Sequence, residues 1–239
     1  MNNNQIFLEL YNQLDIKLRE KYNMDTTSGS VIMRYINDLR RSSYDKIVER
    51  GDRLDIIRNM RNDLVHNLKI NNQDAFTVND NAINFLKEEL ELLEHPILVN
   101  SRYVDIKNVF YGNLSSNVKF LITTMKERGY SYIPILDNKN KLIGAFSALS
   151  LMDTWLNNQE VTFNKNTSIN DLIDNIKLES HNGRYFMFVS LNQELEEVTK
   201  EYLNNAKKGQ KLALIFVTKN GKRNEPILGI LAPYDLLYR

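Results

Sequence analysis

The second half of the chain contains the same order of predicted elements twice, and this internal repeat restricts the fold more than any other feature of the sequence. In each copy, short β-branched or aromatic runs predict strands, and apolar residues three or four positions apart predict helices. The first copy comprises a helix over 116–128 capped by Ser115 or Ser116, a strand over 132–136, a turn over 137–140, a strand over 142–146 and a helix over about 149–156.

The second copy follows after a connecting segment, residues 165–183, in which Thr167, Ser168 and Asp171 predict the start of a further helix. Alternating strands and amphipathic helices are typical of α/β structure. The elements of the second copy are a strand over 186–189, a helix over 195–203, a strand over 212–217, a turn over 219–222, a strand over 227–231 and a helix over 234–238.

The first 96 residues have only the helical pattern. Four apolar stripes predict four helices, and Pro96 ends the last of them because proline cannot continue a helix. We therefore expect an α+β multidomain protein, with an all-α helical bundle over residues 1–96 and two α/β domains over residues 97–159 and 160–239.

Composition narrows the function classes. The 31 Lys and Arg residues balance 30 Asp and Glu residues, so nucleic-acid contact would need a local patch, for which Arg40–Arg41 and Arg58–Arg61 are candidates. Cysteine is absent, which excludes disulfides and thiol chemistry. The sequence shows no secretory signal and no apolar run of about 20 residues, so we expect a cytoplasmic protein without membrane contact.

The repeated unit resembles the CBS domain, named after cystathionine beta-synthase. The resemblance rests on Tyr132-Ile133-Pro134-Ile135-Leu136 followed by Leu142-Ile143-Gly144-Ala145-Phe146-Ser147, and on Leu214-Ile215-Phe216-Val217-Thr218 followed by Leu228-Gly229-Ile230-Leu231-Ala232-Pro233-Tyr234-Asp235. In that family the two copies form a pair, and the cleft between them holds an adenosine derivative. The resemblance therefore implies AMP, ADP or ATP as a regulatory ligand, with no cofactor required.

The family's closing motif places a hydroxyl and a helix start near phosphate and a carboxylate near the ribose hydroxyls. The first copy has Ser147 at the hydroxyl position but Ser150 at the carboxylate position, whereas the second has Ala232 and Asp235, so we expect one usable site. Alternatively, Gly229 and Asp235 serve only a turn and a helix start. The residues that the resemblance implies for the nucleotide are Pro134, Ser147, Ser150, Thr218, Gly229, Ala232, Pro233 and Asp235.

The third predicted helix carries Arg61-Asn62-Asp63-Leu64-Val65-His66, which resembles the Arg-x4-6-His signature of HEPN domains. Many members of that family are metal-independent ribonucleases whose site forms where two copies meet. The resemblance implies His66 as general acid or base, Arg61 as phosphate clamp and Asn62 as a supporting polar neighbour. Residues five apart on an α-helix are displaced by about 140°, so joint action needs the helix to end before His66 or a homodimer to supply the partner.

Two other interpretations remain open. Arg61 can be an ordinary solvated charge and His66 a helix-end histidine, and the helical domain can be a dimerisation module without activity. We expect His95 to lie at a helix end and His181 in an exposed loop, and we expect no metal site. The sequence thus favours a nucleotide-regulated endoribonuclease acting on RNA, with a non-catalytic nucleotide-binding adaptor as the alternative.

Overall fold

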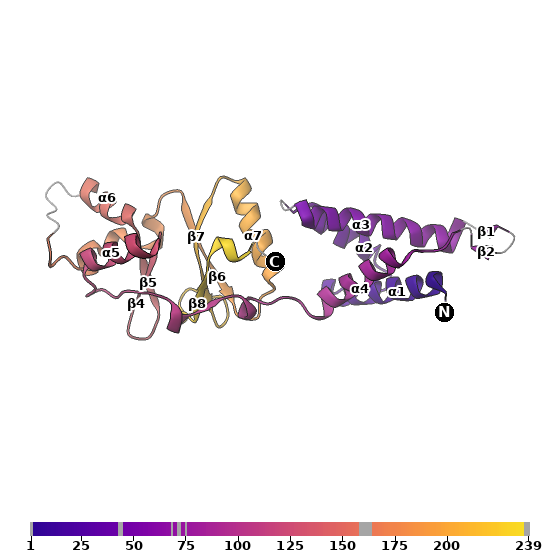
Figure 1. The fold of residues 1–239 in the computed structure, drawn as a ribbon, viewed down its shortest axis with the longest axis horizontal. Coiled ribbons are helices and arrows are strands. Elements are labelled where there is room, and N and C mark those ends of the chain that lie inside the picture. The colour runs from indigo at the N-terminus through magenta and orange to yellow at the C-terminus, as the bar shows by residue number, and fades with distance from the viewer. Residues whose placement is uncertain are drawn as a thin grey trace. The chain divides into compact units, whose positions relative to one another are not determined.

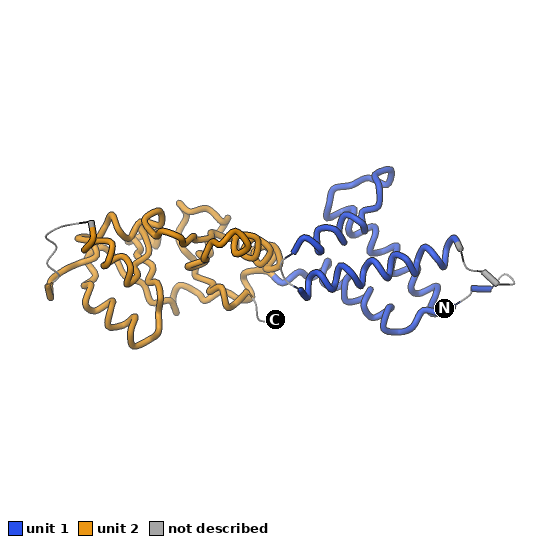
Figure 2. The backbone as a smooth tube through the Cα atoms, turned by 90° about the horizontal axis from the view of Figure 1, so that it is seen from above, with its two compact units in different colours: residues 1–97 blue, residues 98–239 orange. Residues whose placement is uncertain are grey.

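A computed structural model describes residues 2–42, 45–67, 69–70, 73–74, 76–157 and 164–236. The chain divides into two compact units, residues 1–97 and 98–239, which Figure 2 shows in blue and orange. The division falls one residue after the predicted end of the helical domain.

The described residues of unit 1 form four α-helices, labelled α1 to α4 in Figure 1. Three of them begin at an asparagine or serine whose side chain accepts a backbone hydrogen bond from the first turn, and these caps are Asn2, Ser30 and Asn79. The helices are α1 (Asn3–Tyr22), α2 (Val31–Arg40), α3 (Asp45–Asn62) and α4 (Asp80–Glu94). A π-helical turn (Asp63–Asn67) follows α3, and a short hairpin of β1 (Lys69–Ile70) and β2 (Gln73–Asp74), which the sequence pattern did not predict, follows the π turn.

The core of unit 1 comes from the predicted apolar stripes. α1 packs against α4 and α2 packs against α3, and the side chains between them are almost fully buried. Asn4 is a polar exception, because its side chain donates to Asp74 and to the Phe76 carbonyl and accepts from the Val78 backbone N–H, each at 2.8 Å. These bonds fasten the segment before α4 onto α1. The most buried apolar side chains are Phe7, Leu14, Leu18, Ile32, Ile36, Leu39, Leu54 and Leu86.

A charged pair lies inside this bundle. The Glu89 side chain on α4 is 1% exposed, and its Oε1 lies 2.6 Å from Nε of Arg50 on α3. Tyr35 on α2 donates its hydroxyl to Glu89 Oε2 at 3.3 Å and also receives a hydrogen bond from Arg50. Three helices are therefore joined by one polar cluster, which favours a single packing arrangement of α2, α3 and α4.

Unit 2 contains the two predicted copies. The first consists of α5 (Val118–Arg128), β4 (Ile133–Leu136), β5 (Leu142–Phe146) and α6 (Ala148–Asn157). The second consists of β6 (Arg184–Ser190), α7 (Leu195–Lys207), β7 (Lys211–Thr218), β8 (Gly229–Leu231) and a 3-10 turn (Pro233–Leu236). Short elements precede the first copy, namely the 3-10 turns Val99–Ser101 and Ile106–Asn108 and strand β3 (Val104–Asp105).

The two copies have the same topology. In the second copy β6 runs parallel to β7, which pairs antiparallel with β8. In the first copy Gly112 forms a parallel bridge to Ile135 of β4, which pairs antiparallel with β5. A helix crosses between the parallel strands in both, as the predicted repeat requires.

In each copy, the outer strand is covered by the segment that precedes the other copy. β3, before the first copy, pairs with β8 of the second, and the backbone of Ile176, before the second copy, receives the Ala145 N–H of β5 at 2.8 Å. A Cβ on Gly229 would stand 2.1 Å from the Val104 carbonyl oxygen, and one on Gly144 would stand 2.1 Å from the Ile176 carbonyl oxygen. Glycine is therefore needed at both positions so that the covering backbone can approach.

Several predicted helix ends differ from the structure. Asn117, rather than Ser115 or Ser116, caps α5, and its side chain accepts the Phe120 N–H at 3.1 Å. The predicted connecting helix consists of two 3-10 segments, Ile169–Asn175 and Leu178–Ser180, with a kink at Leu172. The predicted last helix is the 3-10 turn at Pro233–Leu236, and residues 237–238 of that prediction lie outside the described residues.

The prediction that His181 is exposed is wrong. His181 is 5% exposed and packs among the rings of Tyr132 and Phe186, with centroids at 5.7 and 5.3 Å. Its Nε2 donates to the Ala145 carbonyl at 2.9 Å, so Nε2 carries the proton. Burial lowers the pKa of His181, while hydrogen bonds to Ala145 and Ile176 oppose that shift. His95, in contrast, is the C-cap of α4.

No helix within the described residues has both the length and the apolar character that a membrane crossing requires. In the same part of the chain, no three His, Asp or Glu residues group closely enough to hold a metal ion.

Candidate functional site

Two candidate nucleotide residues of the first copy, Ser147 and Ser150, lie at the start of α6. Ser147 and Ser150 exchange hydrogen bonds, because Ser147 N–H donates to Ser150 Oγ at 3.2 Å and Ser150 N–H donates to Ser147 Oγ at 3.3 Å. Both side chains are buried, at 3% and 0% exposure. This reciprocal cap stabilises the first turn of α6 and uses the hydroxyls that the family resemblance directs toward phosphate.

The second copy repeats this cap with different residues. Asp235 Oδ2 accepts the Ala232 N–H at 2.8 Å, and the Asp235 N–H donates to the Ala232 carbonyl at 3.0 Å. Because Ala232 has no hydroxyl, only half of the reciprocal cap forms, and the described residues that follow make the 3-10 turn Pro233–Leu236. Asp235 is half-buried, and the bond to Ala232 fixes its carboxylate orientation.

The other candidate residues are divided between the two ends of the strands. Ala232, Pro233 and Asp235 share the turn after β8. Thr218 is fully buried. It lies at the end of β7 that is distant from this turn, because Val217 pairs with Gly229 and Ile215 pairs with Leu231. At about 3.3 Å per residue, Thr218 lies roughly 13 Å along the strand from the position opposite Ala232. The structure therefore does not bring Thr218 to the Asp235 turn.

Pro134 and Gly229 have structural contacts of their own. Pro134 is buried in β4, where it pairs with Ala145, and its carbonyl accepts the Gly112 N–H at 2.9 Å. Gly229 lies in β8 beneath the ring of Tyr103 and the backbone of Val104. Both residues shape the strands that lead to the two caps, and their roles toward a nucleotide stay predictions.

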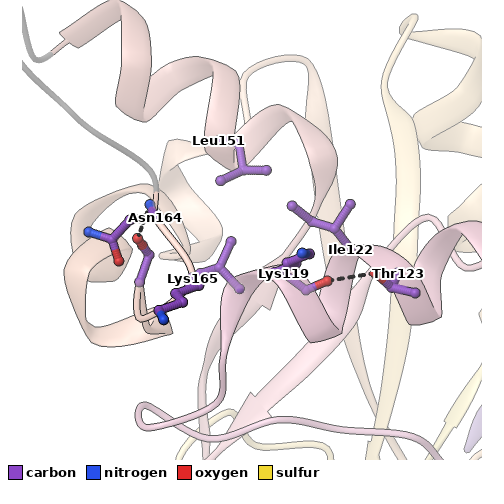
Figure 3. A pocket seen from close by; sticks show the side chains of 8 residues that line it. Lys119, Ile122, Thr123, Leu151, Asn164 and Lys165 are labelled. Atoms are coloured by element: carbon purple, nitrogen blue, oxygen red, sulfur yellow. Dashed lines mark hydrogen bonds between the residues drawn. The ribbon is translucent and has the colours of Figure 1, made fainter.

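Four cavities lined by described residues have volumes of about 520, 270, 630 and 500 Å³. Asp235 lines none of these four. The cavity of about 520 Å³, shown in Figure 3, lies in the first copy between α5 and α6 and contains none of the predicted nucleotide residues.

In unit 1, the Arg-x4-His segment crosses a change of helix type. Arg61 and Asn62 are the last residues of α3, and His66 lies in the π turn. A π turn winds more slowly than an α-helix, so the angular offset between Arg61 and His66 is smaller than the α-helical 140° estimated above. No hydrogen bond joins Arg61 to His66 among the described residues, and His66 is exposed.

Arg61 itself is held against α1. Its guanidinium carbon lies 5.7 Å from the ring centroid of Tyr11, which is 8% exposed, and its Nη1 donates to Asn62 at 3.4 Å. Burial raises the pKa of Tyr11, and the positive charge of Arg61 opposes that shift. No carboxylate pairs with Arg61 within the described part of the chain, and its buried Nε has no hydrogen-bond partner there.

The other arginines proposed for RNA contact are paired with acids. Arg40 lies 2.8 Å from Asp52 and 3.1 Å from Asp55, and Arg58 lies 2.9 Å from Asp55. Arg41 lies 3.5 Å from Asp38. These carboxylates neutralise most of the predicted basic patch. Arg61 differs from the other arginines because the described residues show no carboxylate paired with it.

Comparison with known proteins identifies one domain. The family model of the CBS domain matches residues 104–157, from β3 to the end of α6. The chain therefore contains a CBS domain in this segment, which confirms that part of the sequence prediction. No curated protein matches the chain.

Solved structures with similar folds are distant in sequence. The CBS domains of a transcriptional regulator from Streptococcus pneumoniae share 13% identity at a TM-score of 0.42, covering 59% of this chain and 97% of that chain. CBSX2, solved in complex with AMP, shares 19% identity at a TM-score of 0.41, covering 59% and 93%. A functionally unknown conserved protein domain from Neisseria meningitidis shares 12% identity at a TM-score of 0.43, covering 78% and 99%.

Proposed function

We propose that this protein is a nucleotide-sensing regulatory protein whose second α/β copy binds one adenine nucleotide, namely AMP, ADP or ATP. The observation that carries the proposal is the fixed carboxylate of Asp235 at the end of β8. One of its oxygens accepts the Ala232 N–H at 2.8 Å, which leaves the other oxygen held in place for a ribose hydroxyl. We propose the cytosol as its compartment.

The residues of the first copy favour a single nucleotide site in the protein, located in the second copy. Ser150 occupies the position that corresponds to Asp235, but it is fully buried, carries no charge and bonds to Ser147. A neutral hydroxyl already engaged in a helix cap is a poor partner for ribose. We therefore assign the nucleotide to the second copy alone.

The regulatory part of the proposal rests on the path of the chain out of unit 1. The first residues of unit 2 bond to the second copy, because Val99 N–H donates to Gln193 and Asn100 N–H donates to Leu191, each at 3.0 Å. β3 then pairs with β8, and Ile106 N–H donates to Leu228 at 2.8 Å. A ligand that stabilises the end of β8 would therefore also stabilise the segment that leaves the helical unit.

Thermal unfolding with AMP, ADP and ATP tests nucleotide binding. A ligand that binds only the folded state raises the midpoint, and we expect at least one of the three to do so. Asp235→Asn should abolish this increase. Asp171→Asn is a matched control, because Asp171 Oδ2 accepts the Ser168 N–H at 2.8 Å in a similar 3-10 cap. No midpoint change with any nucleotide, or an unchanged increase in Asp235→Asn, would refute the assignment.

A second function is favoured by the surroundings of Arg61. π turns occur frequently at functional sites, and here one carries the exposed His66 directly after Arg61 and Asn62, the last residues of α3. Among the described residues, no carboxylate pairs with Arg61. We propose that two copies of unit 1 bring Arg61 and His66 together as a metal-independent endoribonuclease in a homodimer, with the nucleotide as its regulator. Arg61 would hold the phosphate, Asn62 would support it and His66 would transfer the proton.

The ribonuclease proposal has its own test. RNA incubated with the protein in chelator should be cleaved, and His66→Ala should remove cleavage while His95→Ala retains it. Adding AMP or ATP should change the rate. Intact RNA under all of these conditions would leave the nucleotide-binding function with unit 1 as an adaptor.

A further inference from the structure

The groove between α5 and α6 is a second candidate ligand site, separate from the Asp235 turn. Its volume of about 520 Å³ falls within the range of small-molecule sites. Val118, Ile122 and Leu151 provide apolar side chains, and Lys119, Thr123, Asn164, Lys165 and Thr167 complete the lining. Figure 3 shows Leu151 and Ile122 facing the same space, with Lys119, Asn164 and Lys165 around it.

Hydrogen bonds hold one wall of the groove, the segment that carries Asn164 and Lys165, against the start of α5. The Asn117 side chain donates to the Lys165 carbonyl at 2.7 Å, and the Val118 N–H donates to the Thr167 carbonyl at 3.0 Å. Ile169 N–H donates to the Ser116 carbonyl at 3.0 Å. The segment that carries Asn164 and Lys165 is thereby fixed against the start of α5, and a preorganised wall lowers the entropy cost of binding.

The polar groups of the groove that stay available to a ligand are mainly hydrogen-bond donors. The Asn164 side-chain oxygen already accepts from Asn166 at 2.8 Å, which leaves its NH₂ group. The Thr167 hydroxyl oxygen accepts from Asn164 at 3.0 Å and keeps its proton, whereas the Thr123 hydroxyl donates to the Lys119 carbonyl at 2.9 Å. The two lysines add ammonium groups, and no acidic residue is among the described residues that line the groove.

We propose that this groove binds a small organic anion with an apolar body. Val118, Ile122 and Leu151 would contact the body, and Lys119, Lys165 and the amide of Asn164 would bind the anionic group. The proposal does not depend on the adenine-nucleotide assignment, because the two sites share no residue.

Equilibrium titration of the full chain with 1-naphthyl phosphate tests the proposal. We expect saturable binding that weakens as salt is added, with weaker binding of 1-naphthol, which lacks the anion, and of inorganic phosphate, which lacks the apolar body. Lys119→Gln and Lys165→Gln should each weaken binding about tenfold, the effect of one charge-assisted hydrogen bond. Lys126→Gln, an exposed lysine of α5 outside the groove, and Asp235→Asn should leave binding unchanged.

Three outcomes would overturn the proposal. The first is equal binding of 1-naphthol and 1-naphthyl phosphate, and the second is unchanged binding in the Lys119→Gln, Lys165→Gln double variant with a native circular dichroism spectrum. The third is a dimer in light scattering that Ile122→Asp converts to a monomer without any binding of 1-naphthyl phosphate, which would assign the groove to a second copy. Binding of AMP that is lost in the lysine double variant but kept in Asp235→Asn would support the groove and refute the Asp235 assignment.

Discussion

At the scale of single residues, the structure assigns packing roles to polar side chains that the sequence alone left ambiguous. Ser147 and Ser150 form a reciprocal helix cap, and their three-residue spacing is the signal that predicts such a cap. His181 could not be predicted as buried, because its ring partners are far apart in the sequence: Tyr132 lies just before β4 and Phe186 lies in β6. Local sequence identifies caps, whereas it does not identify partners that the fold brings together.

The buried pair of Glu89 and Arg50 predicts a large effect of a small substitution. Glu89→Ala would leave the part-buried Arg50 guanidinium without its carboxylate, so we expect a loss of about 3–5 kcal/mol in the free energy of unfolding. Chemical denaturation measures this. Glu88→Ala, at the exposed neighbouring position, is the control and should cost less than about 0.5 kcal/mol. Equal losses in the two variants would contradict the importance of the pair.

His181 predicts a pH dependence of stability. Burial holds its pKa below the ordinary 6.5, so the unfolded chain binds a proton more readily than the folded protein as pH falls. Stability should therefore be full above pH 6.5 and decrease below it, although Asp153 nearby favours protonation and limits the effect. Denaturant midpoints between pH 7.5 and 5.5 measure the slope, and His181→Phe should flatten it. Parallel slopes in the two proteins would contradict this account.

At the scale of elements, the strands and helices with strong local patterns could be predicted, and those set by long-range pairing could not. β4, β5 and α6 lie close to their predicted ranges, and the described part of unit 1 contains α-helices as its apolar stripes predict, because periodicity and turn residues define these elements locally. β3 has only two residues and exists because it pairs with β8, more than a hundred residues later. Long-range pairing also decides which candidate site residues lie together. Thr218 has a suitable side chain, but the register of β7 and β8 places it at the end of β7 that is distant from the Asp235 turn.

The two caps of unit 2 predict opposite changes in stability: removing a hydroxyl from the first cap should destabilise the protein, and adding one to the second should stabilise it. Ser147→Ala removes a hydroxyl that accepts a backbone N–H, so we expect a loss of about 1 kcal/mol. Ala232→Ser would supply the missing half of the second cap and should stabilise the protein by about 0.5–1 kcal/mol. Thermal midpoints of both variants test the equivalence of the caps, and a destabilising Ala232→Ser would argue against it.

Gly144 and Gly229 are each covered closely by another backbone segment, so we expect neither position to tolerate a side chain. Gly144→Ala and Gly229→Ala would each place a methyl group 2.1 Å from a backbone oxygen, and we expect losses of about 3 kcal/mol or failure to fold. Gly29→Ala is the control, because nothing lies within 4 Å of its added Cβ. Soluble yield and denaturant midpoints measure the difference. Wild-type stability of Gly229→Ala would mean that β3 does not cover β8.

At the scale of the whole molecule, the chain forms two compact units, residues 1–97 and 98–239. The repeat predicted two copies with one topology, and the CBS domain that matches residues 104–157 is the first of them. What the sequence could not show is that each copy completes the other's sheet edge. That exchange makes β8 the direct neighbour of the segment leaving unit 1, and it is the physical basis for proposing that a ligand at Asp235 regulates the chain.

Isothermal titration of the full chain with whichever of AMP, ADP and ATP raises its unfolding midpoint, compared between the wild type and Asp235→Asn, tests this central claim most directly. The account predicts one nucleotide bound per chain in the wild type and binding at least tenfold weaker in Asp235→Asn, with Asp171→Asn unchanged. A stoichiometry of two, or equal affinity in the wild type and Asp235→Asn, would contradict it.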